Sequence, residues 1–146
     1  PEKLEGAFTV IDGKPWFDDG LLGHLDADRF LYLTGRVKEM IITGGVNIFP
    51  NEIEAAIKCH DKVMDVAVVR YPDPELGEVP AAVIQPKDGQ AIDASEIVEH
   101  LKSMAFTSFK IPRHIEFTDE LPRHMDGKMM KKQIEDRFWA GIERRG

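Results

Sequence analysis

Two patterns of apolar and polar positions follow one another along this chain, and the change falls near residue 38. The first part has two short β-like segments, 7–11 and 30–33, separated by turn-rich stretches of Gly, Pro and Asp. A lone two-stranded ribbon is only marginally stable in water. We therefore expect residues 1–37 to be the tail of a larger domain, and residues 38–146 to form a domain of their own.

Residues 38–146 carry enough periodic apolar pattern for a compact fold. Ile53, Ala56 and Ile57 are spaced three and four positions apart, which predicts a helix over 51–59. The other predicted elements are a hairpin (38–43 and 46–48), three strands (63–71, 79–85 and 114–117) and two helices (one begun by Asp93 with Glu96 in a capping box, one over 129–142). Strands and helices do not alternate strictly, so we predict an α+β fold: a small three-stranded sheet flanked by helices, plus a separate two-stranded hairpin.

The composition is that of an ordinary globular protein, with 42% hydrophobic and 31% charged residues among 146. A net charge of −7 argues against a nucleic-acid partner, because nucleic-acid surfaces are basic. No apolar run approaches the roughly 18 residues of a membrane span, and the first residues lack a secretory pattern. The one cysteine, Cys59, is expected to be a buried structural thiol, and no metal-ligand pattern is present. We expect a cytoplasmic protein, and the start at Pro1 suits a piece of a longer chain.

The segment 35–54, GRVKEMIITGGVNIFPNEIE, is the most distinctive part of the sequence. Gly44 and Gly45 can adopt the positive φ of a tight turn, and Pro50 suits the first turn of a helix. It is not a phosphate loop, since no Lys-Ser/Thr pair follows the glycines at the required spacing. Local chemistry leaves two interpretations of Arg36 open: a surface charge on a solvated turn, or a fork that binds hydroxyls or phosphate.

A second distinctive segment, 121–128, reads LPRHMDGK. Lys128 follows Gly127 and precedes a predicted helix, where the helix dipole disfavours a resting cation and favours an anion. That placement suits an ammonium that meets an anionic ligand, and an ordinary surface lysine is the alternative. With Lys131 and Lys132, the segment also forms a local basic patch in an acidic chain.

The two segments resemble motifs of acyl-CoA synthetases and other adenylate-forming enzymes. The first resembles their hinge and hairpin motif, and the second resembles the loop that carries their adenylation lysine. The resemblance covers most of the chain, from about residue 20 to residue 138. It implies the C-terminal lid domain of such an enzyme, with residues 1–37 as the tail of the large N-terminal AMP-binding domain and residues 38–146 as the lid.

The resemblance also implies an activity. In this family a carboxylic acid and ATP give an acyl-adenylate and pyrophosphate, and the thiol of CoA then gives the thioester and AMP. The implied partners are the chain's own large N-terminal domain, which binds most of the ATP and Mg²⁺, a fatty or aromatic carboxylic acid, and CoA as co-substrate. The isolated chain is expected to be inactive, because the phosphate-binding loop and the acyl pocket belong to the large domain.

Residue roles follow from the resemblance position by position. Arg36 matches the arginine that contacts the ribose of the nucleotide. Lys38 matches the hinge, whose backbone torsions change when the lid rotates between the two half-reactions. Gly44 and Gly45 match the turn that lines the CoA tunnel, and Lys128 matches the lysine that bridges the carboxylate and the nucleotide phosphate.

The sequence departs from the family pattern at two positions. Leu21 stands where the family has the aspartate that holds the ribose hydroxyls, unless Asp18 or Asp19 substitutes through a shifted turn. Asp126 stands where Ser or Thr is usual, beside Lys128. Two other interpretations stay open: a stand-alone, non-catalytic binding or regulatory module with the lid fold, and the lid of a peptide-synthetase-type adenylation domain.

Overall fold

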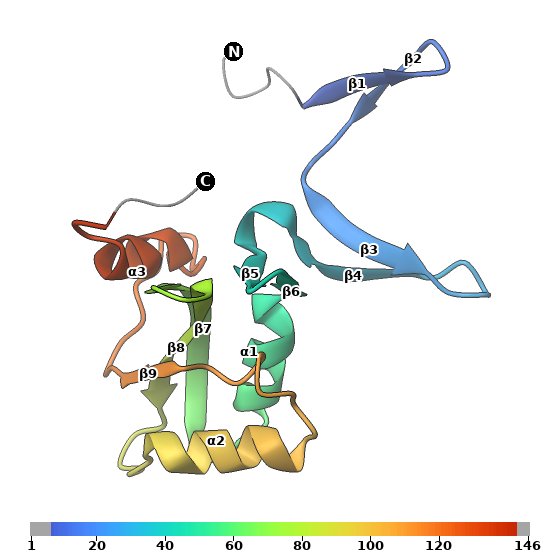
Figure 1. Ribbon diagram of the computed structural model, residues 1–146. Coiled ribbons are helices and arrows are strands. Elements are labelled where there is room, and N and C mark those ends of the chain that lie inside the picture. The colour runs from blue at the N-terminus through green and yellow to red at the C-terminus, as the bar shows by residue number, and fades with distance from the viewer. Residues whose placement is uncertain (1–6, 143–146) are drawn as a thin grey trace. The chain divides into compact units, whose positions relative to one another are not determined.

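The computed structural model describes residues 7–142 of the chain. The chain divides into two compact units, Pro1–Lys38 and Glu39–Gly146. In Figure 1 the first unit is coloured blue, and the second runs from blue-green to red.

The first unit consists of two antiparallel hairpins. β1 (Phe8–Ile11) pairs with β2 (Lys14–Phe17), and β3 (Leu21–Leu25) pairs with β4 (Leu31–Arg36). No side chain of this unit is buried within the described part of the chain, and most of its large apolar side chains are more than half exposed. The apolar pattern located β1 and β4 but missed β2 and β3, whose Pro, Gly and His residues interrupt the alternation.

The second unit is an α+β domain, which confirms the predicted fold class. A 3₁₀ turn over Val37–Glu39 leads into it. Its elements are, in chain order, β5 (Ile41–Thr43), β6 (Val46–Ile48), α1 (Pro50–Lys58), β7 (Val63–Asp73), β8 (Gly77–Pro86), α2 (Ala94–Ser103), β9 (His114–Phe117) and α3 (Lys131–Phe138). The three strands and the hairpin of the prediction are therefore present, with ends that differ by a few residues.

β8 is the central strand of the sheet in this unit. β7 runs antiparallel along one edge of β8, and β9 runs parallel along part of the other edge. The hairpin of β5 and β6, predicted as separate, is joined to the sheet through one register position, Thr43 opposite Gly77. The strands thus form one five-stranded sheet, in the order β6-β5-β8-β7 with β9 also on β8.

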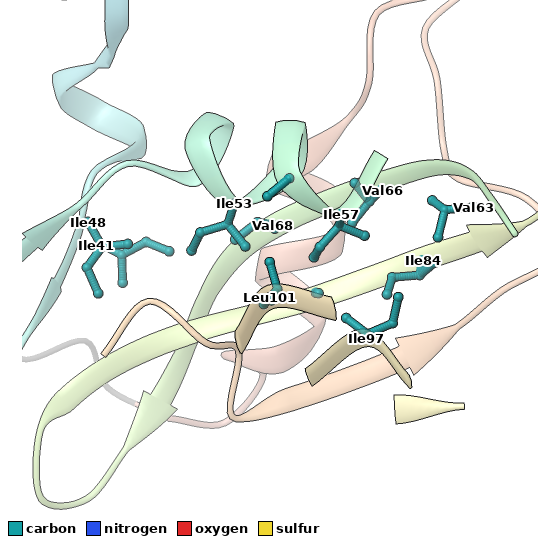
Figure 2. Close-up of a cluster of buried hydrophobic side chains, with 12 residues drawn as sticks. Ile41, Ile48, Ile53, Ile57, Val63, Val66, Val68, Ile84, Ile97 and Leu101 are labelled. Atoms are coloured by element: carbon teal, nitrogen blue, oxygen red, sulfur yellow. The ribbon is translucent and has the colours of Figure 1, made fainter. Parts of the chain in front are cut away.

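Side chains of β7 and β8 alternate between the two faces of this sheet, and both faces are covered. Val66 and Val68 point into a core shared with α1 and α2, which Figure 2 shows. Ala67 and Val69 point the other way, into a smaller core closed by α3 through Ile134. Because both faces of β7 and β8 are buried, the strands read in the sequence as continuous apolar runs.

The helix ends follow local chemistry. At α2 the predicted capping box is present: the Asp93 carboxylate accepts the Glu96 N–H at 3.0 Å, and the Glu96 carboxylate accepts the Asp93 N–H at 3.3 Å. The predicted helix 129–142 is wrong at both ends, because α3 covers only Lys131–Phe138. Its start is delayed because Met130 N donates to Pro122 O at 2.8 Å, which keeps the preceding backbone extended.

The prediction of a buried thiol at Cys59 is also wrong, since this side chain is exposed. Cys59 is the C-cap of α1, and its Sγ–H donates to Ala55 O at 3.3 Å. The buried face of α1 is made by Ile53, Ala56 and Ile57, and residue 59 lies off that face.

Candidate functional site

Gly44 and Gly45 form the turn between β5 and β6, with φ of 54° and 85°. Positive φ at both central residues is the geometry of a tight two-residue hairpin, where a side chain is strained. A Cβ on Gly44 would lie 3.1 Å from Cδ2 of Leu76, so packing also favours glycine there. A Cβ on Gly45 would meet no described atom within 4 Å. Gly45 therefore presents bare backbone to open space on this chain.

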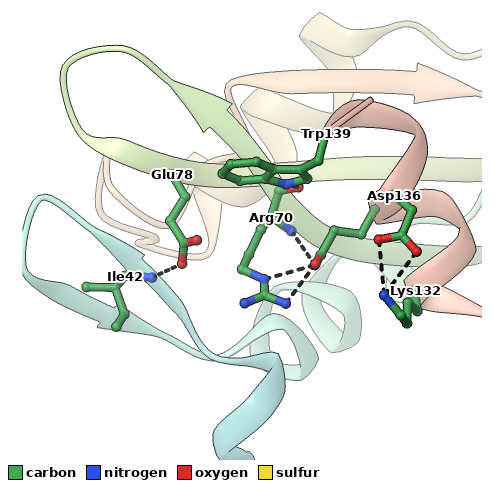
Figure 3. Close-up of polar contacts among 7 residues, drawn as sticks. Ile42, Arg70, Glu78, Lys132, Asp136 and Trp139 are labelled. Carbon is green, nitrogen blue, oxygen red and sulfur yellow. Dashed lines mark hydrogen bonds and ion pairs between the residues drawn. The ribbon is translucent and has the colours of Figure 1, made fainter. Parts of the chain in front are cut away.

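The hairpin is held to the connection between β7 and β8 and to the start of β8. Gly44 N donates to Leu76 O at 3.2 Å, and Ile42 N donates to Oε1 of Glu78 at 2.7 Å (Figure 3). Thr43 is buried at 1% exposure. These contacts fix the Gly44–Gly45 turn at one end of the β7–β8 pair.

Lys128 lies on a short closed loop. Arg123 and Met129 form an antiparallel bridge, and His124 N donates to Lys128 O at 2.9 Å. Gly127 N donates back to His124 O at 2.9 Å, and its φ of 84° favours glycine. Backbone hydrogen bonds therefore give this loop a defined shape.

The loop ends before α3 begins, since Met130 is the N-cap of that helix. Lys128 therefore lies outside the first helical turn, and the helix-dipole argument from the sequence does not apply to it. In the structure, the ammonium of Lys128 is instead exposed on a loop that backbone hydrogen bonds hold in a defined conformation.

The side chain of Lys128 is 81% exposed. Its Nζ lies 3.5 Å from Oδ2 of Asp126, which is 57% exposed. A pair this exposed contributes well under about 1 kcal/mol, so the ammonium can exchange Asp126 for another anion. Lys131 and Lys132 each have a carboxylate within 3.0 Å, so acidic partners balance the expected basic patch.

Arg123 fastens the Lys128 loop to β7. Its Nη1 donates to Gly127 O at 2.7 Å, and its Nη2 pairs with the carboxylate of Asp65. Asp65 is only 9% exposed, and its second oxygen binds Nζ of Lys58 at 2.6 Å. Burial alone would raise the pKa of Asp65, but hydrogen bonds from Lys58 and a backbone N–H, together with the nearby positive charges, leave that pKa lowered.

α3, which follows the loop, is fixed to β7 by a half-buried ion pair. Nε and Nη2 of Arg70 donate to the two carboxylate oxygens of Glu135 at 3.0 and 2.7 Å (Figure 3). The hydrogen bond to Glu135 is the main reason why the pKa of Arg70 is raised. Nε1 of Trp139 also donates to Arg70 O, at 3.1 Å.

Lys131, the first residue of α3, reaches two carboxylates on other elements. Its Nζ lies 2.8 Å from Oε1 of Glu54 on α1 and 3.4 Å from Oε2 of Glu39. Glu39 directly follows Lys38, the predicted hinge, and is the first residue of the second unit. The start of α3 is thus tied to the residue at which this unit begins.

Arg36 is the last residue of β4 and stands opposite Leu21 in the strand register. The predicted ribose-contacting arginine therefore has a leucine, not a carboxylate, directly across from it. Asp18 and Asp19 each use a carboxylate oxygen to accept a turn N–H, from Gly20 at 2.8 Å and from Leu21 at 3.0 Å. Both carboxylates are exposed, and each keeps a second oxygen.

Lys38 is exposed and lies within the 3₁₀ turn Val37–Glu39. The division of the chain into two units falls directly after it. At such a division, a change in the backbone torsions of one residue can move a compact unit as a rigid body.

The Gly44–Gly45 turn and the Lys128 loop lie toward opposite ends of the β7–β8 pair. The turn is bonded to Leu76, between the two strands, and the loop is bonded to Asp65, near the free start of β7. With a rise of about 3.3 Å per residue, the strand from Asp65 to its last residue spans about 26 Å. The structure therefore does not bring the two predicted site elements of this unit together.

Sequence reasoning missed the residues that hold the loop and α3 in place. Arg123 and Asp65 are 58 positions apart, and Arg70 and Glu135 are 65 positions apart, so no local pattern reveals either pair. The position of Arg123 inside the LPRHMDGK segment was the one available signal.

Among residues 7–142, no three His, Cys, Asp or Glu side chains are grouped so that they could hold a metal ion. In the same described range, no helix is both long and apolar enough to cross a membrane.

The fold and the site define a class of domain. It is a small α+β domain that exposes the Lys128 loop near one end of its sheet and the Gly44–Gly45 turn near the other. Residues 52–128, more than half of the chain, match the family described as the AMP-binding enzyme C-terminal domain. The chain belongs to this family, as the resemblance predicted.

Several of the similar proteins are CoA ligases by name, and one is named a fatty acid–[acyl-carrier-protein] ligase. A feruloyl-CoA synthase of an Amycolatopsis species is 39% identical over 132 residues, which cover 90% of this chain and 26% of that protein. An indoleacetate–CoA ligase of Aromatoleum aromaticum is 40% identical over 132 residues, covering 90% of this chain and 25% of that protein. The chain thus spans about a quarter of the length of these relatives.

The fold is also similar to that of a protein of known structure. The structure of ATP-bound MatB from Rhodopseudomonas palustris superposes with a TM-score of 0.84 at 32% identity. The match covers 97% of this chain and 27% of the solved one. Both units of the chain, and not the second alone, therefore have counterparts in a longer protein.

Proposed function

We propose that this chain is the C-terminal part of an ATP-dependent acyl-CoA synthetase, with Glu39–Gly146 acting as a lid on a large nucleotide- and acyl-binding domain. One observation carries the proposal: nine-tenths of the chain aligns with CoA ligases at about 40% identity, yet it covers only a quarter of their length. The exposed apolar side chains of the first unit support it, because strands without a core of their own need a larger body to cover them.

In the proposed reaction the acid carboxylate attacks the α-phosphorus of ATP and displaces pyrophosphate. Lys128 places its ammonium against the carboxylate and the phosphate, where it stabilises negative charge as it develops and orients the attacking oxygen. Its 81% exposure and weak partner support this role, since little has to be broken before it meets a substrate anion. ATP and Mg²⁺ would be held mainly by the large domain.

In the second step the thiol of CoA attacks the acyl carbonyl, loses its proton, and displaces AMP. The bare backbone of Gly45 would border the passage taken by the pantetheine arm of CoA. The open space beyond Gly45 supports this role, because a side chain there would project away from this chain into whatever lies opposite.

A rotation about Lys38 would present the two site elements in turn. The two elements are attached toward opposite ends of a strand segment about 26 Å long, and this arrangement supports the rotation, because elements held that way are difficult to bring to one reaction centre in a single orientation. Arg36, on the other side of Lys38, would stay with the large domain and contact the ribose. Because Leu21 lies across from Arg36, the ribose would lack the usual carboxylate partner unless Asp18 or Asp19 supplies one.

The proposed substrate class is a fatty or aromatic carboxylic acid. Feruloyl-CoA synthase and indoleacetate–CoA ligase are named for aromatic acids, which favours the aromatic half of this class. The proposed compartment is the cytoplasm, where ATP and CoA are available together.

Acid-dependent exchange between ATP and pyrophosphate by the full-length protein tests the proposal. The wild type should support exchange with an aromatic or fatty acid, and Lys128→Ala should lower it roughly 100-fold or more. Lys132→Ala is the matched control, because its side chain is equally exposed at 81% and lies on the adjoining helix. Exchange with no acid at all, or equal loss in both variants, would contradict the assignment.

The rival is a stand-alone module that keeps the lid fold without chemistry. The observation that favours it is Leu21 opposite Arg36, at the position where the resemblance implies a ribose-binding aspartate. A parent protein that binds ATP but yields no pyrophosphate with any acid would support this rival.

A further inference from the structure

We propose that Arg123 is a positioning residue for Lys128: its guanidinium clamps the loop onto the buried carboxylate of Asp65, so that the ammonium is presented in one direction. This inference rests on the proposed function for its catalytic consequence, whereas the clamp itself is a property of the chain.

The geometry of the clamp is specific. One guanidinium nitrogen of Arg123 donates to Gly127 O, one residue before Lys128, at 2.7 Å. Another pairs with Asp65 at the start of β7. A single planar group thus joins the tip of the loop to the sheet, which is a task that suits the fixed fork of arginine.

The carboxylate of Asp65 is also oriented by contacts that do not involve the loop. It is 9% exposed, and its other oxygen accepts Nζ of Lys58 at 2.6 Å and the N–H of Val66 at 2.9 Å. These partners fix the direction of the Asp65 carboxylate, and Arg123 binds its remaining oxygen. Lys58, Asp65 and Arg123 therefore form a continuous chain from the end of α1 to the loop.

Both ends of the loop are anchored in the smaller core, because Leu121 is 1% exposed and Met129 packs against that core. The residues between these two ends have fewer attachments. The loop's internal hydrogen bonds, such as His124 N to Lys128 O, set its shape but do not attach it to the sheet. Met125 at its tip is fully exposed, and the pair of Lys128 with Asp126 stays within the loop. Between the two anchored ends, and among the described contacts, the Arg123 clamp is therefore the one that ties Gly127, beside Lys128, to the sheet.

The first test measures the loop in the full 146-residue chain by the heteronuclear ¹⁵N relaxation and amide exchange of residues 124–128. Arg123→Gln should raise amide exchange of His124 about tenfold and lower the order of Gly127 and Lys128. Arg123→Lys keeps one charged contact but not the fork, so it should give an intermediate result. Arg113→Gln, which breaks an Arg–Asp pair at 3.3 Å elsewhere on the surface, is the matched control and should leave the loop unchanged.

The second test measures the two half-reactions of the full-length enzyme. Arg123→Gln should lower adenylation about tenfold and leave thioester formation from supplied acyl-adenylate unchanged, with partial recovery in Arg123→Lys. If Arg123 had only a structural role, its substitution would instead lower the rates of both half-reactions together.

The two tests separate the clamp from the proposed function. An unchanged loop in Arg123→Gln overturns the clamp whatever the enzyme does. A loosened loop with unchanged adenylation overturns the positioning role. If the wild type shows no adenylation, the proposed function fails, and with it the positioning role, while the relaxation data still decide the clamp.

Discussion

Arg70 on β7 binds Glu135 on α3 through two hydrogen bonds, at 3.0 and 2.7 Å, in the most buried ion pair that joins this helix to the sheet within the described residues. α3 is only eight residues long and could not persist alone in water. The pair, with Ile134 beside it in the core, therefore determines where the segment after the Lys128 loop is held.

The first prediction follows from this pair. Glu135→Gln should lower the free energy of unfolding of the second unit by about 2 kcal/mol, because Arg70 keeps its charge in a half-buried place without its carboxylate. Chemical denaturation followed by far-UV circular dichroism measures the change. Lys132→Ala, which removes an exposed i,i+4 pair on the same helix, should cost less than about 0.5 kcal/mol. Equal effects of the two variants would show that the Arg70 pair does not anchor the helix.

The second prediction concerns how the free energy of unfolding changes at low pH through Asp65. The pKa of Asp65 is lowered in the folded chain, so its carboxylate stabilises the fold above the ordinary value of about 3.9 and loses this effect as the pH falls through the lower folded-state pKa. Asp65→Asn should therefore cost about 1 kcal/mol at neutral pH, after allowance for the exposure of Lys58 and Arg123, and progressively less in acid. Denaturation midpoints of both proteins across the acid range measure this. A constant difference between the two curves would exclude a role for the Asp65 charge.

The third prediction concerns the nucleotide site. Leu21→Asp places a carboxylate directly opposite Arg36 and should lower the KM for ATP of the full-length enzyme by about tenfold, because a carboxylate can accept the ribose hydroxyls. Leu21→Asn is the control, since it has nearly the same shape without the charge. If both variants leave the KM unchanged, the ribose is not bound at this pair of strands.

The fourth prediction concerns the chain by itself. The purified 146-residue chain should show no ATP–pyrophosphate exchange with any carboxylic acid, because the proposed phosphate and acyl contacts lie in the large domain. A radiolabel exchange assay at high chain concentration measures this, with a full-length ligase as the positive control. Exchange above background would mean that these 146 residues hold a complete site.

Much of the fold could be predicted because its signals are local. The strand of Val66 and Val68 is an uninterrupted apolar run, α1 shows the helical spacing, and the Asp93 cap of α2 has its partner three residues away. Within the first unit the strands are exposed, so no burial imposed an alternating pattern that the sequence could display.

The errors arose where distant contacts override local preference. The segment around Met129 has helical spacing, yet its pairing with Arg123 keeps it extended. Cys59 lies in a helical segment but at its end, where the position no longer faces the core. The direction of a loop depends on partners such as Asp65, and only the folded chain shows them.

The candidate site could be predicted from resemblance and not from residue chemistry. A lone lysine after glycine is an ordinary surface residue, and two adjacent glycines are an ordinary turn. The structure contributes their exposure, their attachment and their separation along β7.

The most direct test is a comparison of the two half-reactions in two variants of the full-length enzyme. Lys128→Ala should lower adenylation roughly 100-fold and leave thioester formation from supplied acyl-adenylate intact, whereas Gly45→Leu should do the reverse. Gly89→Leu is the control for backbone strain, since Gly89 has a similar φ of 72° and equally open surroundings. This opposite pattern is the predicted result. If either variant lowers both half-reactions to the same extent, the two ends of the domain do not serve separate steps.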